Sequence, residues 1–236
     1  INGKVLHKEK RKTLFPLIEH VKAALTGSGN VPPPLHSDGS KAPEHWVVST
    51  GYGRSRIDFA NNKLTEIKAH CMGVHIQMKE LIDMSQPYTI VDIGGQDSKI
   101  IESFAGEVRQ FVINRKCAAG TGAYIEELAH RLQIPLEKMS ELEQKHDQEL
   151  TLNSYCTVFA GQEVLRILME GEKVENLIHS LYQSVVKRIF EMAPISTASV
   201  VFSGGVLAHH DSLRKIFAIR LGSEKKTYLA PSAQFC

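Results

Sequence analysis

The chain has 236 residues, of which 42% are hydrophobic and 23% charged, and its formal net charge at pH 7 is +2. A charge this close to zero gives no reason to expect a nucleic acid or an anionic membrane as a partner. No apolar run approaches the roughly 20 residues that a membrane-spanning helix needs, and the N-terminus lacks the apolar stretch of a signal peptide.

The predicted elements begin with a strand in residues 1–6, which has nothing before it to pair with. Apolar residues at helical spacing then predict a helix over 14–25, and Gly, Pro and Ser predict a surface loop over 26–43. A short buried strand at 46–49 ends in a polar loop at 50–54, where ligands often meet α/β sheets. A helix is expected at 66–78, and we place a lobe boundary near residue 86.

The second half continues the alternation of strands and helices that is typical of a mixed α/β protein. Strands are expected at 88–93, 98–104 and 107–113, the last two joined by a hairpin turn at Ala105–Gly106. The remaining elements are a helix at 125–132 that Pro135 ends, an amphipathic helix at 174–189, a buried strand at 200–202 and a helix after Val206. We expect residues 231–236 to form a loop with no closing helix, and we therefore expect the sequence to be a piece of a longer protein.

A first glycine motif, Asp92–Asp97, follows an apolar strand and leads into another strand. In a β-turn-β phosphate site, glycines let backbone N–H groups approach phosphate oxygens, and acidic side chains hold Mg²⁺. The alternative is a tight hairpin with two glycines at positive φ, and this motif alone does not decide between the two.

Two more glycine turns stand where a helix begins. Gly120–Gly122 precedes a helix whose unpaired N–H groups and positive dipole end suit an anion, although Thr121 could equally be a simple helix cap. The Gly120–Gly122 turn lacks the Gly-Lys-Ser/Thr ending of the common P-loop, which argues against that class of nucleotide site. Ser203–Val206 is the third strand-to-helix turn, and three such turns favour a nucleotide site over coincidence.

The chain holds four cysteines, at positions 71, 117, 156 and 236, too few for the disulfide framework of a secreted protein. They favour a cytoplasmic protein whose thiols are free to bind a metal. Cys117 and Cys156 are 39 positions apart, which is no zinc-ribbon or ferredoxin spacing. Two thiolates cannot fill the four positions of an iron–sulfur cluster, but a two-fold dimer would supply four. The alternative, two small buried side chains, is favoured by the residues alone.

These motifs together resemble the ATP-dependent activators of 2-hydroxyacyl-CoA dehydratases. That family includes the nucleotide-binding subunits of benzoyl-CoA reductase and belongs to the superfamily of acetate and sugar kinases, heat-shock chaperones and actin. The matching segments keep the family's order: 49–54, 91–99, 116–122, 156–160, 163–164 and 203–206. His70 also matches a family histidine.

The resemblance implies an α/β, actin-like (ribonuclease H-like) two-lobed ATPase that lacks its first strand and last helix. Residues 1–86 would be part of the first lobe. Residues 87–236 would be the second lobe, with the phosphate loop, the cluster cysteines and the adenosine-side glycine turn. ATP or ADP would bind in the cleft between the lobes.

The resemblance also implies roles for residues. Asp92, Gln96 and Asp97 would be catalytic, with Asp92 near Mg²⁺. The nucleotide would be bound by Gly94, Gly95, Gln96, Asp97, Gly120, Thr121, Gly122, Gly204, Gly205 and Val206. Cys117 and Cys156 of each subunit would hold one [4Fe-4S] cluster between the two subunits of a homodimer.

The implied function is an energy-coupled electron donor. A ferredoxin- or flavodoxin-type protein would reduce the cluster, and ATP would drive a low-potential electron onto a CoA-ester dehydratase or reductase. The alternatives are a small-molecule kinase of the same superfamily, in which both cysteines are incidental, and a non-catalytic nucleotide-binding redox sensor or scaffold. Cys71 and His75 could chelate a metal, but a packed helix face is favoured, and His209–His210 is expected to be a solvated loop.

Overall fold

A mixed five-stranded sheet organises the part of the chain that the computed structural model describes, residues 47–114, 118–152 and 157–233. The expected strand at 1–6, helix at 14–25 and loop at 26–43, and also Cys117 and Cys156, lie outside these residues. The described backbone divides into two units, and the division falls between Ala69 and His70. The lobe boundary near residue 86 stays a prediction.

The described part of the first unit is small. It contains the parallel pair of β1 (Val48–Ser49) and β2 (Asn62–Lys63) and the 3-10 turn η1 (Arg54–Arg56). The Ser49 hydroxyl donates to the carbonyl of Arg54, which closes the polar loop that follows β1. Helix α2 (Glu66–Met78) starts here and runs into the second unit, with the bounds expected from the sequence.

The sheet of the second unit has the strand order β5-β4-β3-β6-β7. Its strands are β3 (Tyr88–Ile93), β4 (Ser98–Phe104), β5 (Glu107–Asn114), β6 (Ser199–Ser203) and β7 (Lys226–Leu229). β3 pairs antiparallel with β4 and parallel with β6, and in this register Asp92 lies opposite Lys99 on one side and Ser203 on the other. The register therefore gathers three polar side chains at one end of the sheet.

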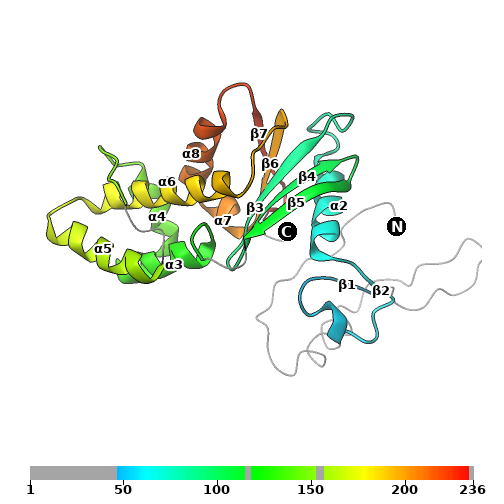
Figure 1. The fold of residues 1–236 in the computed structure, drawn as a ribbon, viewed down its shortest axis with the longest axis horizontal. Coiled ribbons are helices and arrows are strands. Elements are labelled where there is room, and N and C mark those ends of the chain that lie inside the picture. The colour runs from blue at the N-terminus through cyan, green and yellow to red at the C-terminus, as the bar shows by residue number, and fades with distance from the viewer. Residues whose placement is uncertain (1–46, 115–117, 153–156, 234–236) are drawn as a thin grey trace, which may run out of the picture. The chain divides into compact units, whose positions relative to one another are not determined.

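The remaining helices of the described part are α3 (Gly122–Arg131), α4 (Met139–Glu143), α5 (Thr157–Met169), α6 (Val174–Met192), α7 (Gly205–His209) and α8 (Asp211–Leu221), with the 3-10 turn η2 (Leu136–Lys138). The core joins Val91, Ile93 and Phe202 of the sheet to α3, α6 and α8. Figure 1 shows α6 and α8 on one face of the sheet and α2 beside the other. Every residue of β3 is buried, because both faces of this central strand are covered.

Most of the expected elements of the second unit are confirmed. The hairpin turn is at Ala105–Gly106, with φ of 51° and 81°, and the predicted strands before and after it are present. β7 has no counterpart in the sequence predictions, because it is a short, half-exposed edge strand. No helix in the described residues is long and apolar enough to cross a membrane.

Candidate functional site

The first part of the candidate site is a buried charge cluster at the end of β3. The Lys99 Nζ atom lies 2.9 Å from Oδ2 of Asp92 and 2.6 Å from Oδ1 of Asp97. The side chains of Lys99 and Asp92 are only 4% and 2% exposed. A cation buried this deeply is stable only when it is paired, so Lys99 ties the end of β3 to the turn that follows it.

A hydrogen-bonded chain continues from Asp92 across the sheet. The Ser203 hydroxyl donates to Oδ1 of Asp92 at 3.2 Å, and Nε2 of His70 lies 2.8 Å from the same hydroxyl oxygen. Since the hydroxyl proton goes to the carboxylate, the consistent tautomer of His70 carries its proton on Nε2 and donates it to Ser203. This series of hydrogen bonds links α2, β6 and β3 through buried side chains.

The glycine turns meet at this same end of the sheet. In the β3–β4 turn, the Gly94 N–H donates to the Asp97 carbonyl at 3.0 Å. The N–H groups of Gly122 and Ala123, at the start of α3, donate to the carbonyls of Gly94 and Gly95 at 2.9 and 2.8 Å. These two N–H groups are therefore paired with the neighbouring turn, which corrects the expectation that the helix start is open to an anion.

Residues 118–121 are anchored to the sheet. Asn114 Nδ2 donates to the Ala119 carbonyl at 3.0 Å, and Ser98 donates to the Gly120 carbonyl. Thr121 stands at the N-cap position of α3, but its hydroxyl donates back to the Ala118 carbonyl at 2.7 Å and makes no capping bond. The simple capping interpretation of Thr121 is therefore wrong.

Gly204 is the position where only glycine fits. Its φ is 88°, and a Cβ there would lie 2.4 Å from the Ile93 carbonyl oxygen and 2.6 Å from Asp92 Oδ1. Gly122 is also confined, since its Cβ would meet Val206 Cγ2 at 2.9 Å. The three turns are thus in direct contact with one another.

Gly95 and Gly205 differ from these positions. Neither has positive φ, and the same is true of Gly94, so the alternative of a tight hairpin with two glycines at positive φ is wrong. A Cβ at Gly95 or at Gly205 would meet nothing within 4 Å. Bare backbone beside open space leaves room for a ligand to approach closely, which is the geometry that a phosphate group needs.

The carboxylate of Asp92 bears on whether Mg²⁺ fits. Its two oxygens already accept bonds from Lys99 and Ser203. A direct bond to Mg²⁺ would have to displace one of them, whereas an ion held through its own water would not, because each oxygen keeps a lone pair. The residues therefore fit a Mg²⁺ ion bound through water, beside the partly exposed Asp97.

Sequence reasoning did not give Lys99 or Ser203 a role. The pairing of Lys99 could have been expected from its position, two residues after Asp97 and at the start of the next strand. Gln96 lies exposed at the tip of the turn, next to the open space at Gly95.

Two other sequence hypotheses can be compared with the structure. The packed interpretation of Cys71 is confirmed: its thiol donates to Ser103 Oγ at 2.9 Å, and burial raises its pKa. His209 is exposed, but His210 is buried and hydrogen-bonded to Tyr182 at 2.6 Å, so the expectation of a solvated His209–His210 loop is wrong for His210.

Known proteins resemble most of the chain. The activator of lactoyl-CoA dehydratase of Anaerotignum propionicum is 35% identical over 177 residues, which are 74% of this chain and 66% of that protein. The (R)-2-hydroxyglutaryl-CoA dehydratase activating ATPase of Acidaminococcus fermentans is 33% identical over 193 residues, which are 80% of this chain and 71% of that protein.

Solved structures agree with these relatives. The activator of the 2-hydroxyisocaproyl-CoA dehydratase from Clostridium difficile, solved with bound ADPNP, superposes with a TM-score of 0.73 at 28% identity, over 92% of this chain and 76% of that one. The expected actin-like α/β fold is thereby confirmed. The family model for the BadF/BadG/BcrA/BcrD ATPases matches residues 35–228. The chain belongs to the BadF/BadG/BcrA/BcrD ATPase family.

Proposed function

We propose that the protein is an ATP-dependent reductive activator, which delivers a low-potential electron to a CoA-ester dehydratase or reductase. The observation that carries this proposal is the pair of backbone hydrogen bonds between Gly94–Gly95 and the start of α3. They join the turn proposed to bind phosphate to the loop that follows Cys117. The names of the relatives, activators of lactoyl-CoA and 2-hydroxyglutaryl-CoA dehydratases, support the same assignment.

In this proposal the three glycine turns bind ATP and ADP. The open backbone at Gly95 and Gly205 receives the nucleotide, and the rest of segments 94–97, 120–122 and 204–206 lines the site without offering the paired N–H groups of the start of α3. Asp92 holds Mg²⁺ through water, and Gln96 and Asp97 stand on the turn where they can orient the attacking water. Lys99 keeps the two aspartates in place.

Cys117 and Cys156 are proposed to hold one [4Fe-4S] cluster together with the same two cysteines of a second copy. The donor set fits, because such a cluster takes four thiolates and a two-fold dimer supplies two from each chain. The bound cluster would supply one-electron chemistry at low potential. The protein itself would couple the nucleotide site to the cluster. A shift of the Gly94–Gly95 turn would move the start of α3 and with it residues 118–121, which follow Cys117.

ATP can change the cluster's environment only by binding one conformation better than the other. We propose that the dehydratase or reductase partner accepts the electron and carries out the acyl-CoA chemistry. A ferredoxin- or flavodoxin-type protein in the cytoplasm would supply the electron.

The test is the iron and acid-labile sulfide content of anaerobically purified protein. About four of each per dimer are expected. Cys117→Ala should lose both, and Cys71→Ser, a matched change of a thiol bonded inside the fold, should keep them. If the wild-type protein holds no iron after reconstitution, the activator proposal is wrong and a kinase of the same superfamily or a nucleotide-binding scaffold replaces it.

A second measurement separates the activator from a nucleotide-binding scaffold. Protein with its cluster, a reductant and the partner enzyme should reduce the partner when ATP is present, but not when ADP replaces it. Equal reduction with ATP and with ADP would favour the redox sensor or scaffold.

A further inference from the structure

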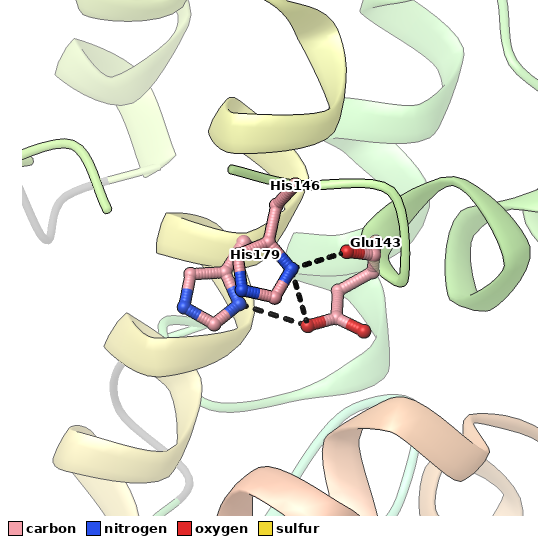
Figure 2. A group of neighbouring side chains, drawn as sticks. All are labelled: Glu143, His146 and His179. Atoms are coloured by element: carbon pink, nitrogen blue, oxygen red, sulfur yellow. Dashed lines mark hydrogen bonds and ion pairs between the residues drawn. The ribbon is translucent and has the colours of Figure 1, made fainter. Parts of the chain in front are cut away.

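A second polar cluster, formed by Glu143, His146 and His179, has no part in the glycine-turn site. Glu143 ends α4, His146 lies three residues later, and His179 is on α6 (Figure 2). Nδ1 of His179 lies 2.8 Å from Oε1 of Glu143, and Nδ1 of His146 lies 3.6 Å from the same oxygen. One donor atom from each residue lies within 4.8 Å of the other two.

The charge of Glu143 is the first argument for a bound cation. Its side chain is only 6% exposed, and in the described part of the chain its ionic neighbours are the two imidazoles, with no lysine or arginine. Removing a carboxylate from water is costly unless a charge compensates it. A divalent ion between the carboxylate and two imidazoles supplies that charge.

The frame that holds the three side chains is fixed by hydrogen bonds on both sides. Next to His146, the Asp147 N–H donates to the Asn176 side chain on α6 at 2.9 Å, and Asn176 Nδ2 returns a bond to Asp147 at 2.9 Å. The Leu150 N–H donates to Ser180 Oγ at 2.7 Å. The segment with His146 is thus fastened to the helix with His179, which gives the preorganisation that a ligand site needs.

The second nitrogen of His179 also has a neighbour suited to a metal ligand. Its Nε2 lies 3.4 Å from the side-chain amide of Gln183, one turn further along α6. When Nδ1 binds a metal, Nε2 carries the proton, and the Gln183 amide can turn its oxygen to accept it. Such a partner for the outer nitrogen is what fixes a ligating histidine in its ring orientation.

All three donors line one pocket of about 620 Å³ between α4, α6 and α8. Lys215 and Arg220 also line it. Three protein ligands beside an accessible pocket leave one coordination position open to water or to an anionic ligand, as in zinc sites that bind small molecules.

We propose that Glu143, His146 and His179 form a site for a divalent transition ion, with Zn²⁺ the preferred one. Two imidazole nitrogens and one carboxylate oxygen suit Zn²⁺, whereas Mg²⁺ and Ca²⁺ favour oxygen ligands alone. Donors bound to one tetrahedral Zn²⁺ stand about 3.3 Å apart, between the 2.8 and 3.6 Å found here. The two rings are stacked 3.6 Å apart at 8°, and Nδ1 of His146 lies 2.6 Å from the Glu143 carbonyl oxygen (Figure 2), so His146, a third exposed, must tilt and give up that hydrogen bond to meet the ion.

The test is Zn²⁺ titration by calorimetry of the chelator-treated full chain, with His146→Ala as the ligand variant and His130→Ala as the control. His130 is an exposed histidine on α3, so its removal subtracts one imidazole without touching the cluster. The wild type and His130→Ala should each bind one more Zn²⁺ than His146→Ala. Loss of a ligand should weaken the site by at least about 100-fold, beyond the effect of losing an outer-sphere partner.

Co²⁺ distinguishes this site from the cysteines. Co²⁺ bound here should show visible bands of a four-coordinate nitrogen and oxygen site, without the near-ultraviolet absorption of cobalt thiolate, and His179→Gln should remove these bands. Thermal unfolding without metal shows whether each variant is folded, and Zn²⁺ should raise the melting temperature of the wild type more than that of His146→Ala. The same Zn²⁺ stoichiometry and affinity in the wild type, His146→Ala and His179→Gln would overturn the proposal.

Discussion

Replacing Gly204 with alanine should be the most damaging single-methyl change at the candidate site. The backbone there has φ 88° and ψ 154°, a region that costs a residue with a side chain about 1–3 kcal/mol. The new Cβ would lie 2.4 Å from the Ile93 carbonyl oxygen and 2.7 Å from its carbon, both backbone atoms of the central strand. Relieving that overlap adds roughly 1–3 kcal/mol.

Together these costs lower the free energy of unfolding by about 3 kcal/mol or more, which corresponds to a fall in melting temperature of roughly 6–12 °C for a domain of this size. Gly205→Ala is the matched control, because its Cβ would meet nothing within 4 Å. Its melting temperature should stay at the wild-type value or rise slightly, since alanine favours a helix over glycine.

Urea unfolding of the two variants and the wild type measures the difference. In an ATP titration of the same proteins, Gly205→Ala should bind ATP more weakly than the wild type, although its stability is the same. Its methyl group occupies the open space proposed for the nucleotide. Equal unfolding midpoints for Gly204→Ala and Gly205→Ala would refute the steric reasoning.

Lys99→Met should lower the free energy of unfolding by about 3–5 kcal/mol, because two carboxylates lose their shared buried cation. Lys138→Met breaks an exposed pair and should leave the urea midpoint close to the wild-type value, so similar midpoints for the two variants would contradict this reasoning. Burial lowers the pKa of His210 to about 4. The unfolded chain takes up this proton near pH 6.5, so the contribution is complete above that pH and about 3 kcal/mol is lost as the pH falls to 4. His210→Asn should therefore lose less stability than the wild type between pH 7.5 and 4.5, and equal losses would count against the assignment. Burial raises the pKa of the Cys71 thiol, so iodoacetamide should label it only after unfolding, as peptide mass spectrometry would show; rapid labelling of the folded protein would disprove this.

The sequence was informative where a local pattern sets the structure. The apolar run before Asp92 and the two glycines after it predicted the β-turn-β unit, because burial and turn chemistry act over a few residues. The same holds for the hairpin at Ala105–Gly106, where both residues take positive φ.

The side-chain partners could not be predicted in this way. Lys99 pairs with Asp92 because the antiparallel register of β3 and β4 places them opposite each other. Ser203 joins them because β6 pairs in parallel with β3, although Ser203 is 111 residues from Asp92 in the sequence. His210 stands beside an exposed histidine, between α7 and α8, and it is buried against Tyr182 of α6, which comes from 28 residues earlier in the chain. Contacts of this kind depend on tertiary structure, which no local spacing encodes.

The two hydrogen bonds from Gly122 and Ala123 have a consequence for hydrogen exchange. The first amides of a helix ordinarily exchange quickly, since they have no acceptor within the helix. Here both amides have acceptors in the Gly94–Gly95 turn, so they should be protected as long as that turn keeps its position. Their deuterium uptake with and without nucleotide would thus report directly whether the two loops move together. This measurement needs neither a reductant nor a partner enzyme.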